Sequence, residues 1–176
     1  TKARVDWYDE VLPEISPDLV VLASLPRDGS PHLEVRDRKD EPLERAMLQG
    51  TKRTLEKIQK VSSRALMIES VVVPTRFKPN HCLTSTQDPA RCAVPAPTRN
   101  RPSDGFYLAA AADSPDLFTV NLNPAFCPSA PVCHPVVDGE IVWRDKHHVA
   151  PEFAAKQRQK VWRLIRRTGV LDDISA

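Results

Sequence analysis

The sequence predicts an α/β fold with a mostly parallel sheet, and three observations support this class. First, Leu19–Leu25 is an apolar run, which is typical of a parallel strand that helices cover on both faces. Second, Ala65–Val73 has the same character. Third, each run follows a segment with helical periodicity, and the order helix, strand, helix, strand with short connections favours right-handed crossovers within one parallel sheet.

Two amphipathic segments predict the helices of this first half. The first spans Val5–Ile15, where apolar residues recur at helical spacing. The second spans Leu43–Ser62 and keeps one face apolar. The segment 26–42 between them is polar and charged, so we expect a surface loop. The apolar positions of the second helix are Leu43, Met47, Leu48, Thr51, Leu55, Ile58 and Val61.

The second half is less regular. Pro74–Arg101 is rich in proline and lacks periodicity, and long excursions of this kind in compact domains are often functional. Asp104–Ala112 predicts a short helix rich in alanine, and Phe118–Leu122 predicts a third strand. Asp138-Gly139 lies between two short apolar stretches, Val136–Val137 and Ile141–Trp143, which predicts a hairpin with a type I′ turn.

A last helix is predicted from Pro151 to about Thr168. Proline suits the first helical position, and Gly169 suits the C-terminal cap. Its inward positions are Phe153, Gln157, Val161, Leu164 and Ile165. Its other face carries Lys156, Arg158, Lys160, Arg163, Arg166 and Arg167. We interpret this basic face as a solvated helix surface, with contact to anionic headgroups or to an acidic glycan as the alternative.

Composition limits the classes of function. A chain of 176 residues is expected to form one domain with a real core. The net charge of +2 does not suggest a nucleic-acid partner, and seventeen prolines against five glycines indicate stiff connections. No apolar run approaches the ~20 residues that span a bilayer. The chain starts without Met and directly at a helical pattern, so we expect residues 1–176 to be a single domain truncated at its N-terminus.

The four cysteines favour two local disulfides, Cys82–Cys92 and Cys127–Cys133. Each pair flanks a proline-rich loop, and neither has the C-x-x-C spacing of a redox or zinc site. Disulfides of this kind imply an oxidising compartment. The alternative is four reduced, buried thiols in a cytosolic protein.

Asp145 and His148 form the constellation most suggestive of chemistry. They follow a predicted strand and precede a predicted helix, where catalytic groups of open α/β sheets gather. A three-residue offset on a turn can place the carboxylate beside Nδ1 of the imidazole, which leaves Nε2 to activate a hydroxyl. This interpretation makes His148 a general base and Asp145 its orienter. The alternative is a surface Asp and His that cap a helix start.

The block from Cys127 to Ala154 resembles the last block of SGNH (GDSL-type) hydrolases. More narrowly, it resembles the SGNH domain fused to the C-terminus of bacterial membrane acyltransferases of family 3. The shared features are a Cys-flanked loop, a hairpin at Asp138-Gly139, the run Arg144-Asp145-Lys-His-His148, and a helix after it. Leu19–Leu25 and Ala65–Val73 resemble the third and fourth strands of that family.

The resemblance implies a three-layer SGNH/flavodoxin-like fold and a Ser-His-Asp triad for acyl-ester chemistry. His148 and Asp145 match the base and its orienter, whereas His147 is off-phase by one. The family's serine belongs to a Gly-Asp-Ser block that would lie upstream of Thr1. Ser24 falls near the expected Asn block and is a candidate oxyanion donor, although a buried or capping hydroxyl is the favoured interpretation.

The resemblance also implies partners and a location. The acyl group would come from a fused membrane acyltransferase domain, and the acceptor would be an exported or cell-surface carbohydrate. The domain would be extracytoplasmic and tethered by an N-terminal transmembrane domain absent from this chain. We expect no cofactor, no metal and no nucleic acid.

Three competing hypotheses remain. The chain could be a non-catalytic module of the same fold that holds a glycan or a partner for a membrane acyltransferase. A metal site could use His134, His147, His148 and the cysteines, although paired cysteines would be unavailable to zinc. Thr1 could act as an N-terminal nucleophile, which would need a free, processed amine.

Overall fold

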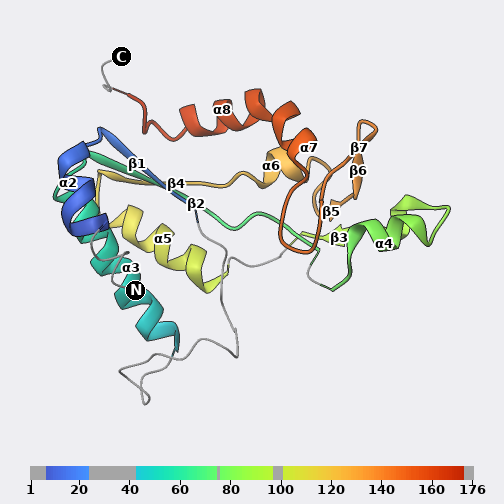
Figure 1. The fold of residues 1–176 in the computed structure, drawn as a ribbon, viewed down its shortest axis with the longest axis horizontal. Coiled ribbons are helices and arrows are strands. Elements are labelled where there is room, and N and C mark those ends of the chain that lie inside the picture. Colours follow the sequence, from blue (N-terminus) through green and yellow to red (C-terminus); the bar gives the residue numbers. More distant parts are fainter. Residues whose placement is uncertain (1–6, 24–42, 75, 97–100, 173–176) are drawn as a thin grey trace. The chain divides into compact units, whose positions relative to one another are not determined.

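The computed structural model describes residues 7–23, 43–74, 76–96 and 101–172 (Figure 1). Its contacts divide the chain into two compact units. The sheet unit comprises Thr1–Glu69, Asn100–Val120 and Thr168–Ala176. The disulfide unit comprises Ser70–Arg99 and Asn121–Arg167. Within the described residues, no helix has both the length and the apolar character needed to cross a membrane.

The sheet unit is built on a parallel sheet with the strand order β1-β2-β4. The strands are β1 (Leu19–Ala23), β2 (Arg64–Ile68) and β4 (Leu117–Val120). Parallel strands need crossover connections, and helices α3 and α5 lie in the chain between these strands. The predicted α/β class with a parallel sheet is therefore confirmed.

Strand β2 is shorter than the sequence suggested, because it ends at Ile68 rather than at Val73. Beyond Ile68, the side chain of Asn123 forms hydrogen bonds with backbone groups that a neighbouring strand would otherwise bind. Its Oδ1 accepts the N–H of Val72 at 2.7 Å, and its Nδ2 donates to the carbonyl of Ser70 at 3.0 Å. The Asn123 side chain thus replaces hydrogen bonds between strands, and the chain after Ile68 is no longer part of the sheet.

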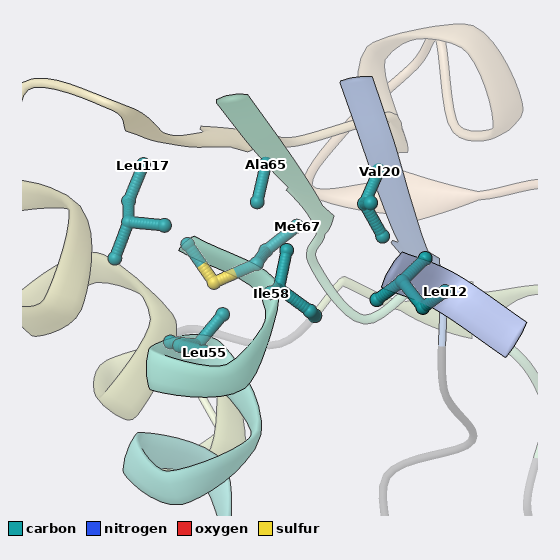
Figure 2. Packing of buried hydrophobic residues seen from close by; sticks show 7 residues of the cluster. All are labelled: Leu12, Val20, Leu55, Ile58, Ala65, Met67 and Leu117. Carbon is teal, nitrogen blue, oxygen red and sulfur yellow. The ribbon is translucent and has the colours of Figure 1, made fainter. Parts of the chain in front are cut away.

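The helices of the sheet unit enclose one apolar core (Figure 2). They are η1 (Trp7–Val11), α2 (Leu12–Ile15), α3 (Leu43–Gln59) and α5 (Pro102–Ala112). In its described part, the predicted first helix therefore contains a π-helical turn. The second helix ends at Gln59 rather than at Ser62, and the N–H of Ser62 donates to the carbonyl of Ile58 at 2.9 Å. The core residues are Leu12, Val20, Leu55, Ile58, Ala65, Met67 and Leu117.

One expectation for β1 is wrong at Val21. The apolar run predicted a strand covered on both faces, whereas the Val21 side chain is 52% exposed. Along β1, Val20 is buried whereas Val21 and Ala23 are exposed, so this strand is covered on the face of Val20 only in the described structure. Residues 24 and 25, the end of the predicted strand, lie outside the described residues.

In its described residues 76–96, the proline-rich excursion forms regular elements. It contains α4 (Pro79–Thr84), η2 (Pro89–Cys92) and the short strand β3 (Val94–Pro95). Strand β3 pairs antiparallel with β5 (Val132–Cys133). The disulfide Cys82–Cys92 closes a loop within the excursion, and Cys127–Cys133 closes the loop that ends at β5. Both have the local pairing that the spacing favoured.

The rest of the disulfide unit holds α6 (Asn123–Phe126), a hairpin and two helices. Strands β6 (Val136–Val137) and β7 (Glu140–Ile141) form the predicted hairpin. Asp138 and Gly139 have φ of 51° and 78°, as a type I′ turn requires.

The predicted last helix is divided into α7 (Pro151–Lys156) and α8 (Arg158–Arg166). Gln157 lies between them in right-handed helical conformation, and its N–H is shared by the carbonyls of Phe153 and Ala154. The division is therefore a tightened turn rather than a change to extended chain. Gly169 has the left-handed conformation expected beyond a helix C-terminus, with φ of 78°.

Candidate active site

The site is a five-residue loop whose two ends are joined by backbone hydrogen bonds. Trp143 and Val149 form an antiparallel bridge, and Ala150 donates its N–H to the carbonyl of Val142 at 2.8 Å. Inside the bridge, Arg144 donates its N–H to the carbonyl of His148 at 3.0 Å. The residues 144–148 are thereby held as a closed loop between hairpin β6–β7 and helix α7.

Trp143 anchors this loop. Its side chain is fully buried, and its indole Nε1 donates to the carbonyl of Val72 at 2.9 Å. The N–H of the same residue, Val72, is bound by Asn123. Because the Trp143 ring is buried and its N–H is hydrogen-bonded, this residue fixes the direction of the chain where the loop begins.

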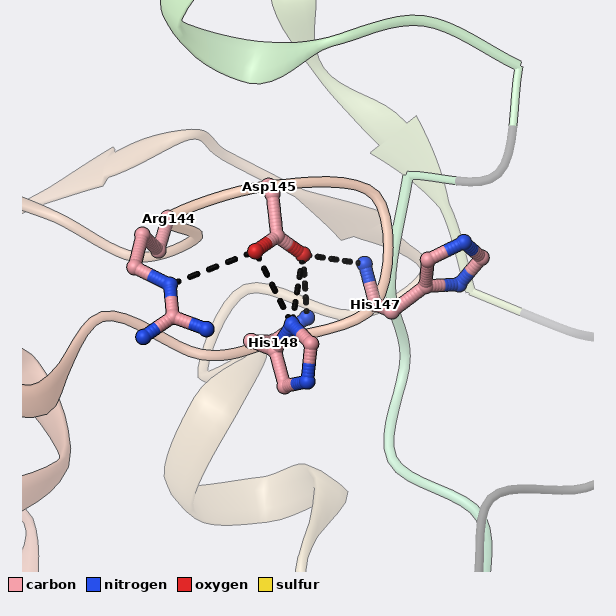
Figure 3. A network of polar contacts seen from close by, with 4 residues as sticks. All are labelled: Arg144, Asp145, His147 and His148. Carbon is pink, nitrogen blue, oxygen red and sulfur yellow. Dashed lines mark hydrogen bonds and ion pairs between the residues drawn. The ribbon is translucent and has the colours of Figure 1, made fainter.

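Asp145 and His148 lie side by side in this loop (Figure 3). Nδ1 of His148 is 2.8 Å from Oδ1 and 2.9 Å from Oδ2 of Asp145. A carboxylate in this position favours the tautomer with the proton on Nδ1, which leaves Nε2 as an acceptor. Nε2 lies on the ring edge away from Asp145 in Figure 3. The pair has the arrangement of an orienting acid and a general base.

The same carboxylate also organises the loop backbone. Oδ1 of Asp145 accepts the N–H of His147 at 2.8 Å and that of His148 at 3.0 Å. Arg144 donates its Nε to Oδ2 at 3.2 Å. These donors stabilise the ionised form, first the His147 backbone N–H and then the side chains of His148 and Arg144, so the pKa of Asp145 lies well below its usual range. Asp145 is therefore an anion at neutral pH.

The pair is open to solvent within the described structure. The side chains of His148 and Asp145 are 60% and 40% exposed. An exposed Nε2 can receive a hydroxyl that another part of a protein or a substrate supplies. The pair thus has the geometry that the acid and base of a triad require.

The remaining sequence candidates have different positions. The ring of His147 lies edge-on to that of His148 with centroids 6.5 Å apart, and only its backbone N–H binds Asp145. Ser24 lies outside the described residues. All four cysteines are in disulfides, so none offers a thiolate to the metal site considered as an alternative.

Sequence reasoning missed two contributors, Arg144 and Trp143. The Arg-Asp dipeptide was a usable signal, because an arginine next to an acid can reach its carboxylate. The tryptophan carried no such signal, because its partner Val72 is distant in sequence.

Comparison with known proteins identifies the family. Residues 2–162 match the family described as SGNH domain (fused to AT3 domains). No curated protein and no solved structure matches the chain. The match covers most of the chain and includes the loop of Asp145 and His148, and the parallel sheet agrees with it. The chain therefore belongs to the family of SGNH domains that are fused to AT3 domains.

Proposed function

We propose that this domain is part of a carbohydrate O-acyltransferase or acetylesterase that uses a Ser-His-Asp triad on exported or cell-surface glycans. The observation that carries the proposal is the contact of both Asp145 carboxylate oxygens with Nδ1 of His148. Membership of the SGNH family supports the acyl-ester class of reaction. The chemistry calls for no cofactor.

The proposed reaction has two steps. Nε2 of His148 accepts the hydroxyl proton of the serine as its oxygen attacks the acyl carbonyl, and His148 returns that proton to the leaving group. A sugar hydroxyl or a water then attacks the acyl-serine while His148 again accepts and returns a proton. The Asp145 carboxylate stabilises the imidazolium formed in each step.

The serine is proposed to lie in a Gly-Asp-Ser block upstream of Thr1. The resemblance of the chain to the family implies this position. The acyl donor is proposed to be a fused AT3 membrane acyltransferase domain, in keeping with the family description. The two disulfides support an extracytoplasmic location.

Fluorophosphonate labelling of the full-length protein, with peptide mapping by mass spectrometry, tests the proposal. We expect label on a serine upstream of Thr1, and loss of label in His148→Ala but not in His147→Ala. Label on a serine within residues 1–176 would contradict the upstream position. A folded, disulfide-bonded protein that takes no label would favour a non-catalytic module that binds a glycan or a partner.

A further inference from the structure

Helix α8 presents a continuous basic face. At 100° per residue, five cations lie on an arc of about 200° around its axis. All five side chains are exposed, and from Gln157 to Val170 the sequence contains no acidic residue. In the described parts of the chain, none of them has an ion-pair partner, whereas Lys156 on α7 pairs with Glu140. The five cations are Arg158, Lys160, Arg163, Arg166 and Arg167.

A tryptophan lies within this basic face. Trp162 is 53% exposed, and its helical position falls between those of Arg158 and Arg166. Together with Arg158, Gln159 and Arg163 it lines an open hollow of about 480 Å³. An indole held outward among cations is unusual for a helix surface that meets only water, because tryptophan is usually largely buried.

We propose that this face of α8 docks on an anionic phospholipid surface. Clusters of four to eight Lys or Arg on a helix are typical of binding to anionic headgroups, and tryptophan prefers the boundary between headgroups and water. The inner positions Val161, Leu164 and Ile165 are partly buried in the protein. The helix therefore meets the membrane with its basic face and Trp162, rather than by inserting an apolar face.

The length of the basic face favours a lipid surface over an acidic sugar. Arg158 and Arg167 are nine residues apart, which is about 13 Å along a helix. A sugar ring stacked on Trp162 would meet the cations on either side of the ring and leave the others unused. A plane of lipid phosphates contacts Arg158, Arg166 and Arg163, which surround Trp162 along the length of the helix. Lys160 and Arg167 lie at the edge of this arc and add to the positive potential, so charge complementarity favours the membrane surface.

Vesicle co-sedimentation of the 176-residue chain tests the proposal. We expect binding to vesicles of phosphatidylglycerol with phosphatidylcholine, little binding to phosphatidylcholine alone, and weakening with added salt. The double variant R158Q/R163Q should bind about 25-fold more weakly, at about fivefold for each cation removed. The control K52Q/R53Q removes the same charge from the exposed face of α3 and should bind like the parent.

A second variant separates contact by Trp162 from general electrostatics. Because Trp7 is also exposed (42%), the measurement uses a Trp7→Phe background. This protein should show a blue shift of tryptophan emission on phosphatidylglycerol vesicles, and adding Trp162→Phe should abolish it, because the remaining Trp143 is buried. Absence of vesicle binding, or equal weakening by the α3 control, would overturn the proposal. Binding to a soluble polyuronate without binding to vesicles would overturn it in favour of an acidic glycan.

Discussion

At the residue scale, His148 differs from the neighbouring His147 by its contacts with Asp145, because the two side chains are chemically the same. His148 offers Nδ1 to the carboxylate, whereas His147 offers only its backbone N–H. In the full-length protein, His148→Ala should lower kcat/KM for ester cleavage or transfer at least about 10³-fold. His147→Ala keeps the backbone donor and should change activity little. Equal losses in both variants would contradict the assignment of the base.

Asp145 has two tasks in this loop, since it binds the imidazole and also two backbone N–H groups. Asp145→Asn should lower kcat by about 10³–10⁴-fold, as replacement of the orienting acid does in serine proteases. We also expect the loop to lose order, because an amide accepts on one oxygen only. Proton NMR of the His147 and His148 amides, measured beside activity, separates the two effects. An active variant with an intact loop would argue against the orienting role.

The low pKa of Asp145 has a defined effect on stability. In the folded state its pKa lies below the ordinary aspartate value of 3.8, so the folded state favours the anion. The stabilisation is fully present when the pH is above the pKa of the unfolded state. It is lost as the pH falls through the pKa of the folded state. The free energy of unfolding of Asp145→Asn should therefore be lower than that of the parent at neutral pH. The two values should converge at strongly acidic pH, which acid unfolding of both proteins checks. A constant difference between parent and variant across this range would contradict this.

The pKa of Glu69 is shifted in the opposite direction from that of Asp145. Burial raises its pKa above 4.5, with a further rise from Asp104 and an opposing hydrogen bond from Thr119. The folded state therefore binds a proton more tightly than the unfolded state, and stability falls as pH rises through the window above 4.5. Glu69→Gln should be more stable than the parent at neutral pH and equal to it at acidic pH. Urea unfolding at both pH values checks this, with the exposed Glu56→Gln as control.

At the element scale, the loop depends on a single buried ring. Trp143→Phe keeps an aromatic ring but removes the donor to the Val72 carbonyl. Leaving that acceptor unpaired should lower the free energy of unfolding by about 1–3 kcal/mol. Trp162→Phe is the matched control at an exposed position, where a change within about 0.5 kcal/mol is expected. Equal effects in urea unfolding would show that the Trp143 contact has no special weight.

Local signals explain the elements that sequence predicted well. Asp138-Gly139 specifies its turn by backbone preference, Gly169 ends a helix for the same reason, and the strands of the parallel sheet follow from apolar runs. The end of β2 was not predictable, because it depends on Asn123, which lies 51 positions from Val72. The β3–β5 pair was missed because two-residue strands carry no periodicity.

In the candidate site, as in the fold, the local contacts were predictable from the sequence and the distant ones were not. The three-residue offset from Asp145 to His148 was sufficient to suggest their contact, because a turn brings such residues together. Arg144 and the anchoring of Trp143 required the three-dimensional structure. Distant partners determine how rigidly the loop is held, and a single sequence does not display them.

At the scale of the whole molecule, the two disulfides stabilise one unit only. A bond that closes a loop as short as Cys127–Cys133 should contribute about 2 kcal/mol by restricting the unfolded chain. The variant Cys127→Ser/Cys133→Ser should therefore unfold at lower urea concentration. The sheet unit contains no cysteine, so the amide NMR signals of α3 should change less on reduction than those of the site loop. Uniform unfolding on reduction would contradict this division.

The placement of the cysteines has a consequence for the timing of maturation. Both disulfides belong to the unit that carries Asp145 and His148. In a reducing cytoplasm the sheet can form while this unit lacks its cross-links. With the proposed extracytoplasmic location, the unit that carries the acid–base pair would gain its cross-links only after export, when the thiols meet an oxidant. Under the proposed function, oxidation would then coincide with arrival among the glycan acceptors, and acyl chemistry would be delayed until the chain has left the cytoplasm.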